Sequence, residues 1–393
     1  MLHQALEVEV AEYVVRHREA RDDSGHALVT RHGKARSRQV TIGAGTMTVK
    51  APRVRDRRVD GAGHRQRFTS AILPPYMRRS PKVAEVLPVL YLRGLSTGDF
   101  REALPLLLGE EASAGLSPTT ITRLTAAWQQ DYETFRKRDL HDKRYVYLFA
   151  DGVHFRIRLE EDRLCALVLI GVLEDGSKEL VAVEDGYRES GESWLAVLRD
   201  LQSRGLEAPL LAIGDGALGF WKAVREVWPK TAEQRCWVHR TANVLDKLPK
   251  RLQPRAKKHL HEIFKAETKE IAEEQVRAFA KEYGDRYPKA VASLIKDEEK
   301  LLSYYDFPAA HWQTIRSTNV IESAFATVKL RTRVTKGAGT RTRGLTMAFQ
   351  LLVMAEKRWR KIRSPHLVAE VLGGTKFLDG RSSQEQNQEG RAA

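Results

Sequence analysis

The sequence predicts an α/β protein built around a mixed β-sheet, and three observations carry this prediction. Two apolar runs, YVYLFADG and APLLAIGDG, are typical of buried strands, and both end in Asp-Gly. Two further apolar runs follow the first and meet at a hairpin turn, Asp175-Gly176. Amphipathic helices separate the later strands. Three antiparallel strands followed by alternating helices and strands indicate a mixed sheet of the ribonuclease-H type.

Composition narrows the class of protein. The chain has 393 residues, of which 42% are hydrophobic, enough for two or three domains with their own cores. No run approaches the roughly 18 apolar residues that a membrane-spanning helix needs, so we expect no membrane association and no signal peptide. The two cysteines, Cys165 and Cys236, are too few for a disulfide framework. These features together predict a cytoplasmic protein.

The net charge of +15 is concentrated in two segments. Residues 15–79 contain 16 Lys and Arg against five acids, and residues 329–363 contain 11 Lys and Arg with Glu356 as the one acid. The rest of the chain is therefore acidic on balance. Basic segments on either side of an acidic centre predict a polyanionic partner. The alternative is a basic surface that serves solubility alone.

Local patterns divide the chain into segments. Alternating apolar and polar residues before Ser80 indicate a β-hairpin after a weakly structured start. Ser80-Pro81 and Ser117-Pro118 are helix-start signals, and three short helices with tight turns predict a helix-turn-helix-like module that contacts DNA. The expected segments are 1–79, a basic N-terminal region with the β-hairpin; 80–140, the helix-turn-helix-like module; 141–239, the first part of the sheet domain; 240–315, an α-helical insertion; 316–379, the second part of the sheet domain; and 380–393, a disordered tail.

Three acidic residues are candidates for a metal site. Asp151 and Asp215 each end an apolar strand, at the edge of the sheet where α/β folds carry their sites. Glu322 lies one turn into a helix that is expected to cross the same edge. Because close carboxylates repel each other unless a cation neutralises them, the three together predict bound Mg²⁺, with Mn²⁺ as a substitute, and attack on a phosphodiester. The alternative is three unrelated acids, two in turns and one on a helix surface.

Basic residues downstream of Glu322 are candidates for DNA contacts. On a continuous helix Lys329 lies two turns beyond Glu322 and Arg333 one turn further, so both would lead phosphates toward the acids. Asn319 adds a polar side chain beside Glu322, and an Arg-rich stretch leaves the predicted hairpin. A solvated charged face is the alternative. The DNA-binding candidates are Lys329, Arg331, Arg333, Lys336, Arg341, Arg343, Asn319, Arg55, Arg57 and Arg58.

Several stretches carry a resemblance to a known family. They are ADGVHFRIR, IGDGALGFWKAV, QRCWVHRTANVLDKLPK and STNVIESAFATVKLRTRVTKGAGT, with KAPRVRDRR and SPTTITRLT upstream. Together they resemble the Mutator family of bacterial insertion-sequence transposases, over most of the chain.

The resemblance implies a DDE transposase with a ribonuclease-H-like catalytic domain interrupted by a helical insertion. It implies that Asp151, Asp215 and Glu322 take the three catalytic, metal-holding positions. Family members act on the terminal inverted repeats of their own element, so the implied partners are double-stranded terminal-repeat DNA and target DNA. Synapsis of two element ends favours a homodimer or higher multimer, associated with the bacterial nucleoid.

The family also carries a Cys-x-x-His signature, matched here by Cys236 and His239. We expect His239, at the end of a short strand, to act in catalysis by hydrogen bonding to a phosphate or a catalytic carboxylate. A plain core or capping histidine is the alternative. Cys-x-x-His alone is half of a zinc site, so we expect no structural zinc. Trp312, just before the Glu322 helix, is a weaker candidate for stacking on a flipped base.

Two other functions fit the same residues. One is a catalytically silent protein, a decayed copy or repressor, that binds the terminal repeats with a steep salt dependence and gives no product. The other is a structure-specific nuclease with a ribonuclease-H-like site, which would cut DNA without joining it.

Overall fold

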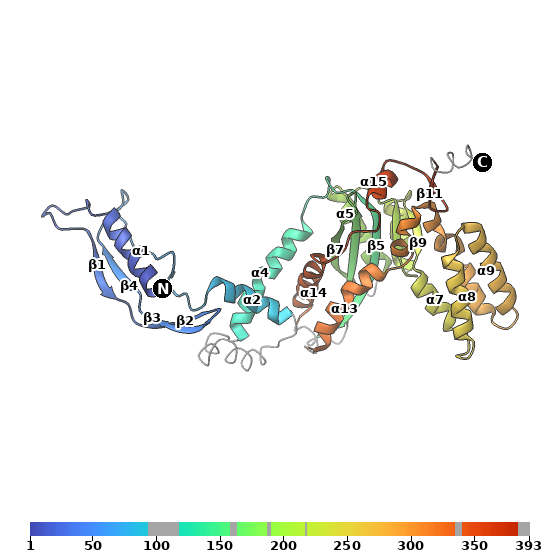
Figure 1. Ribbon diagram of the computed structural model, residues 1–393, viewed down its shortest axis with the longest axis horizontal. Coiled ribbons are helices and arrows are strands. Elements are labelled where there is room, and N and C mark those ends of the chain that lie inside the picture. Colours follow the sequence, from blue (N-terminus) through green and yellow to red (C-terminus); the bar gives the residue numbers. More distant parts are fainter. Residues whose placement is uncertain (93–117, 158–162, 187–189, 217, 335–339, 384–393) are drawn as a thin grey trace. The chain divides into compact units, whose positions relative to one another are not determined.

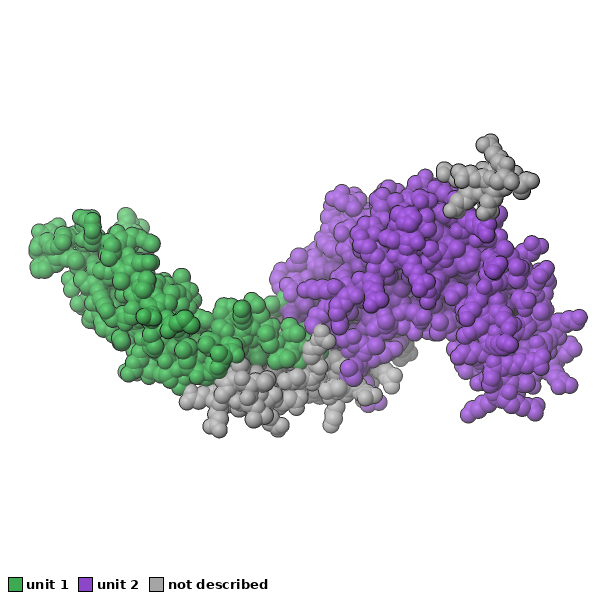
Figure 2. All heavy atoms as spheres, in the orientation of Figure 1, with its two compact units in different colours: residues 1–127 green, residues 128–393 purple. Residues whose placement is uncertain are grey.

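The chain divides into two compact units, residues 1–127 and 128–393 (Figure 2). The structure is a computed structural model, and it describes residues 1–92, 118–157, 163–186, 190–216, 218–334 and 340–383. Figure 1 shows the elements in chain order, with the helical N-terminus in blue.

The first unit combines one helix with two pairs of strands. Strands β2 (Arg38–Ile42) and β3 (Gly45–Val49) form an antiparallel hairpin, and β1 (Val29–Lys34) pairs with β4 (Pro52–Asp56). The expectation of a weakly structured start is wrong, because α1 spans Leu2–Arg16. Its Leu6 packs in a small core with residues of the hairpin, and the burial of that side chain fixes the helix.

Two helices of the predicted helix-turn-helix-like module are described. They are α2 (Pro81–Leu92) and α4 (Pro118–Arg136), and both begin at the predicted Ser-Pro signals. The predicted middle helix falls within residues 93–117, outside the described residues.

The second unit is built on a five-stranded mixed sheet with the strand order β7-β6-β5-β8-β9. The first three strands in sequence are antiparallel, and β8 and β9 run parallel to β5. Apolar runs bounded by turn residues predict all five. The strands are β5 (Tyr145–Arg156), β6 (Arg163–Leu173), β7 (Lys178–Gly186), β8 (Leu211–Gly214) and β9 (Ala232–Arg235).

Helices α5 (Gly191–Ser203) and α6 (Leu218–Val227) share one core with the sheet. That core includes Leu148 and Ala150 of β5. Since side chains alternate along a strand, Phe149 and Asp151 point to the opposite face. Helix α13 (Asn319–Val334) contacts β5, and α14 (Arg341–Glu356) contacts β6 and β7.

One predicted strand boundary is wrong. The sequence predicts that Asp151 ends its strand, but β5 continues past it to Arg156 because β6 remains paired with it along that length. The parallel pairing with β8 does stop just before Asp151, at Phe149. Asp151 therefore lies where β5 loses one neighbour and keeps the other.

The helical insertion follows β9 directly. The predicted strand through His239 is wrong at its end, because β9 stops at Arg235 and α7 begins at Trp237. His239 therefore lies in the first turn of a helix. The insertion consists of α7 (Trp237–Leu245), α8 (Gln253–Lys265), α9 (Lys269–Tyr283), α10 (Pro288–Ile295), α11 (Glu298–Leu301), the 3-10 turns η2 (Ser303–Asp306) and η3 (Ala309–His311), and α12 (Trp312–Ile315).

The C-terminal part closes against the insertion. After α15 (His366–Leu372), two short strands pair, β10 (Phe377–Leu378) and β11 (Arg381–Ser382). The predicted disordered tail therefore begins too early at residue 380, since the N–H of Gly380 donates to the carbonyl of Tyr305. Residues 384–393 lie outside the described residues. Among the helices that are described, none combines the length and apolar character that crossing a bilayer requires.

Candidate active site

Asp151 and Asp215 belong to neighbouring parallel strands. The β5–β8 register pairs Phe149 with Ile213, and continuing it by two residues aligns Asp151 with Asp215. Asp215 comes directly after β8, and its backbone carbonyl accepts hydrogen bonds from the Trp221 indole (2.8 Å) and the Arg235 guanidinium (3.0 Å). Pairing with β6 thus fixes the backbone of Asp151, and these two hydrogen bonds fix that of Asp215.

Glu322 is held by the residue that caps its helix. The Thr318 carbonyl accepts the N–H of Glu322 (3.0 Å), and the Thr318 hydroxyl donates to Glu322 Oε1 (2.9 Å). Thr318 itself is fully buried. Helix α13 contacts β5, so the Glu322 carboxylate lies in the first turn of a helix packed beside the strand of Asp151.

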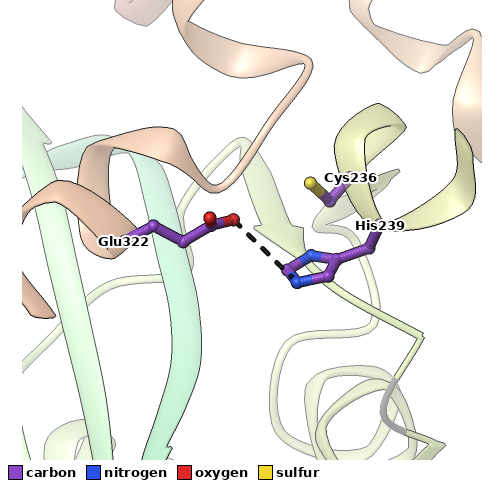
Figure 3. A group of neighbouring side chains, drawn as sticks. All are labelled: Cys236, His239 and Glu322. Atoms are coloured by element: carbon purple, nitrogen blue, oxygen red, sulfur yellow. Dashed lines mark ion pairs between the residues drawn. The ribbon is translucent and has the colours of Figure 1, made fainter. Parts of the chain in front are cut away.

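Cys236 and His239 lie opposite Glu322 (Figure 3). The ligand atoms of Cys236, His239 and Glu322 all lie within 4.8 Å of one another, and His239 Nε2 is 3.9 Å from Glu322 Oε1. Cys236 is the N-cap of α7, and its sulfur accepts the backbone N–H and the hydroxyl of Thr318, each at 3.3 Å. The prediction for His239 named a phosphate or a catalytic carboxylate as its partner. In the structure it lies beside a carboxylate, that of Glu322.

The surroundings of His239 favour its charged, protonated form. The hydrogen bond to Cys236, the charge of Cys236 and the carboxylates of Glu322 and Asp151 raise the pKa of His239 to about 9, although partial burial opposes the change. Burial would raise the pKa of the Cys236 thiol, but hydrogen bonds from His239 and Thr318 outweigh it and lower that pKa. Asp151 and Glu322 thus both contribute negative potential at His239.

One group of three ligand atoms close enough to share a cation is found here among the described residues. Cys236, His239 and Glu322 form a mixed set of sulfur, nitrogen and oxygen, but among the described residues it has one donor fewer than the four of a structural zinc site. The predicted set of Asp151, Asp215 and Glu322 offers oxygen donors alone, the kind that suits Mg²⁺ and Mn²⁺.

The basic candidates near the C-terminus are divided between two helices. Lys329, Arg331 and Arg333 belong to α13, and Lys329 is exposed with its Nζ 6.0 Å from the centre of the Phe325 ring. Glu322, Lys329 and Arg333 all lie on α13, as the prediction of one continuous helix expects, and α14 begins at Arg341. Arg341 forms a two-bond ion pair with Asp185, whereas Arg343 is exposed. Lys336 lies outside the described residues.

The arginines of the first unit differ in their surroundings. Arg55 and Arg57 are exposed, as a phosphate contact requires. Arg58 turns inward, where it pairs with Asp56 (2.7 Å) and donates to the Tyr13 hydroxyl (2.8 Å). Its guanidinium is therefore engaged within the unit, and a structural role suits it better than the predicted DNA contact.

Sequence reasoning missed Thr318 and misjudged Trp312. Thr318 stands just before Asn319, so its capping position could be inferred, but its contact with Cys236 joins residues 82 apart in sequence. The Trp312 ring packs edge-to-face against Tyr304 and Tyr305, and its indole donates to the Phe307 carbonyl (2.8 Å). Trp312 is thus a packing residue rather than a platform for a base.

Comparison with known protein families shows to which class of protein this chain belongs. The family model described as "Transposase, Mutator family" matches residues 1–360. The chain belongs to the Mutator family of transposases, enzymes that act on DNA.

Named relatives agree with the family. The chain is 56% identical over 299 residues to the transposase for insertion sequence element IS6120 of Mycolicibacterium smegmatis, a match that covers 76% of this chain and 92% of that protein. It is 51% identical over 288 residues to the transposase for insertion sequence element IST2 of Acidithiobacillus ferrooxidans, covering 71% of this chain and 95% of the relative. The resemblance seen in the sequence motifs is thereby confirmed.

Proposed function

We propose that this transposase cuts and joins DNA strands at the terminal inverted repeats of its own insertion sequence, with Asp151, Asp215 and Glu322 as the DDE carboxylates. One arrangement supports the proposal: Asp151 and Asp215 each lie two residues beyond the last paired residues of neighbouring parallel strands, and Glu322 lies on α13, which contacts the strand of Asp151. The strand order β7-β6-β5-β8-β9 supports a ribonuclease-H-like catalytic domain, with the helices from α7 to α12 as its insertion.

The residues present fit a divalent cation. Three carboxylates supply the hard oxygen donors that such a cation prefers. Asp151, Asp215 and Glu322 would hold Mg²⁺, or Mn²⁺ in its place. When bound, such ions activate the attacking hydroxyl and neutralise the leaving oxygen of a phosphodiester. The protein's own part is to hold the carboxylates in place and to position the DNA strand.

His239 has a supporting part in this proposal. Its imidazole lies 3.9 Å from Glu322 Oε1, so it orients that carboxylate by charge attraction. With a pKa of about 9 it carries a positive charge near neutral pH, which also suits contact with a phosphate.

We assign DNA-end recognition to the first unit and to the helix-turn-helix-like module. The exposed Arg55 and Arg57 supply phosphate contacts, and α2 and α4 belong to a helix-turn-helix-like module that reads the terminal repeat. Because two element ends must be held together, the working form is a homodimer or higher multimer. Such a protein works on DNA in the bacterial cytoplasm, at the nucleoid.

The experiment is cleavage and strand transfer in vitro on duplex DNA that carries the terminal repeats. Wild-type protein should give product with Mg²⁺ or Mn²⁺ and none in chelator. Asp151→Asn, Asp215→Asn and Glu322→Gln should each abolish product while leaving terminal-repeat binding intact. The matched controls are Asp142→Asn and Glu174→Gln, since both acids are exposed and neither belongs to the proposed triad.

Three results would contradict the proposal. Full activity in a triad variant removes that residue from the site. Binding of terminal repeats without any product, at every metal concentration, shows a catalytically silent repeat-binding protein. Cleavage without joining, and without need for the terminal repeats, shows a structure-specific nuclease.

A further inference from the structure

A groove of about 660 Å³ lies beside the first turn of α13. Asn319, Val320 and Ser323 of α13 line it, together with residues 358–361 and Arg363. A second hollow of about 490 Å³ shares Gln313 and Asn319 with the first, so the depression continues toward α7 and α8. Both hollows lie within the second unit.

The chemistry of this groove suits a polyanion. Arg358, Arg360 and Arg363 are exposed along it, and the described residues that line it include no acid. Among the ion pairs of the described residues, none involves these three guanidiniums, so they are available to a ligand. By contrast, Arg341 is already paired with Asp185.

The wall that carries the arginines is anchored to the turn between β6 and β7. Lys361 pairs with Asp175 (2.7 Å), the N–H of Ile362 donates to the Gly176 carbonyl (2.9 Å), and Lys178 Nζ donates to the Arg360 carbonyl. Ile362 is buried beneath the segment. Because the backbone is held at two points and the Lys361 side chain adds a third contact, binding there costs little ordering of the chain.

Trp359 distinguishes this groove from an ordinary basic surface. Of the seven tryptophans in the chain, five are buried and Trp312 packs against tyrosines with its indole hydrogen-bonded. Trp359 is partly exposed and lines the groove between Arg358 and Arg360. An aromatic face beside arginines is the combination that single-stranded DNA sites use, with bases stacked on the ring and phosphates on the cations.

We propose that this groove binds one strand of DNA, with phosphates on Arg358, Arg360 and Arg363 and an unpaired base stacked on Trp359. The assignment rests on the proposed function, since a strand-transfer enzyme must hold a separated strand close to its carboxylates. A duplex keeps its bases stacked internally, so it offers Trp359 no free face. The first turn of α13 links the two sites, because it presents Glu322 toward His239 and lines the groove through Asn319 and Ser323.

The first test locates the strand by fluorescence. The full chain is titrated in chelator with a single-stranded oligonucleotide of about 12 nucleotides, and tryptophan emission is followed. We expect the oligonucleotide to quench wild-type emission, and Trp359→Phe to remove most of that quenching, because the other tryptophans are buried or packed. Unchanged quenching in Trp359→Phe would overturn the stacking assignment.

The second test measures the arginines by affinity and salt dependence. The triple variant Arg358→Ala, Arg360→Ala, Arg363→Ala should bind the single strand at least about tenfold more weakly, with a salt slope reduced by about 2. A matched control is the triple variant Lys281→Ala, Arg286→Ala, Lys289→Ala, which removes the same charge from exposed positions on or beside α9 and α10. It should leave the affinity within about twofold. Melting temperatures of all variants check the fold.

The outcomes separate this proposal from the catalytic one. Loss of single-strand affinity in the arginine variant alone, with duplex affinity retained through the rest of the chain, supports the groove. Equal losses in both triple variants, or for duplex and single strand alike, would show a general charge effect and overturn it. Binding is measured without metal, so failure of the triad proposal leaves this result interpretable, and failure here leaves the triad untouched.

Discussion

At the scale of single residues, Thr318 joins the parts of the candidate site. Its hydroxyl lies 2.9 Å from Glu322 Oε1, 3.3 Å from the Cys236 sulfur and 3.4 Å from His239 Nδ1. One hydroxyl proton serves one acceptor at a time, and the carboxylate is the nearest. Thr318 therefore orients Glu322, while its backbone N–H holds Cys236.

Thr318→Val tests this positioning role, because valine keeps the branched shape and removes the hydroxyl. We expect strand cleavage to fall about ten- to a hundredfold and to need more Mg²⁺, as is usual when a ligand loses its outer partner. Titration of Mg²⁺ against cleavage rate measures both effects, and Thr318→Ser should recover most of the activity. Wild-type Mg²⁺ dependence in the valine variant would show that the hydroxyl does not matter.

At the scale of elements, a buried ion pair ties α1 to the β1–β4 ladder. The Asp56 side chain is 1% exposed, pairs with Arg58 and accepts the Tyr13 hydroxyl of α1 (2.8 Å). The hydrogen bond from Arg58, helped by that from Tyr13, lowers the pKa of Asp56 from 3.8 to about 2, although burial opposes it. The folded unit therefore prefers the ionised carboxylate.

This shift predicts a pH dependence of stability. A folded-state pKa below the unfolded value gives stability that is fully present above about pH 4 and is lost as pH falls through about 2. Asp56→Asn should lower the stability of this unit at pH 7 by about 1–3 kcal/mol and flatten the acid dependence. Hydrogen exchange of the β1 and β4 amides measures the first effect, and acid unfolding the second. An unchanged acid profile in Asp56→Asn would assign the dependence to other groups.

The helices and strands also show how much of the fold could be predicted from the sequence. Five strands lie at their predicted segments, because apolar runs between turn residues are strong signals. The continuation of β5 past Asp151 depends on pairing with β6, which no local pattern reports. His239 lies in a helix and not in the predicted strand. The sequence could not separate the two, because buried Cys236 and Trp237 fit either structure. The α1 helix escaped notice because its packing against the hairpin, rather than a strong periodicity, stabilises it.

Contacts across long separations explain the rest of the candidate site. Thr318 contacts Cys236 across the whole insertion, 82 residues away in sequence. Trp359 and its neighbouring arginines look in the sequence like a solvated basic stretch, and their groove exists because the β6–β7 turn anchors that segment. Such features need the tertiary structure.

At the scale of the whole molecule, exposed arginines occur in both units. Arg55 and Arg57 of the first unit face solvent, and a second group of arginines lines a groove beside α13 in the second unit. The acids of the proposed triad lie within that second unit, on β5, after β8 and on α13. In this account the basic surfaces bind DNA and the acids hold the cations that allow phosphate to approach.

The central claim is that Asp151, Asp215 and Glu322 hold the metal ions directly, and a metal-switch experiment tests it most directly. Each residue is replaced by Cys, and cleavage of terminal-repeat DNA is measured with Mg²⁺ and with Mn²⁺. Thiolate is a poor ligand for Mg²⁺, and Mn²⁺, a transition metal, tolerates sulfur better. If the three residues are metal ligands, each Cys variant gives no product with Mg²⁺ and partly recovers with Mn²⁺, while Asp142→Cys behaves as wild type in both. Wild-type cleavage with Mg²⁺ in a triad variant, or no recovery with Mn²⁺ in any of the three, would contradict it.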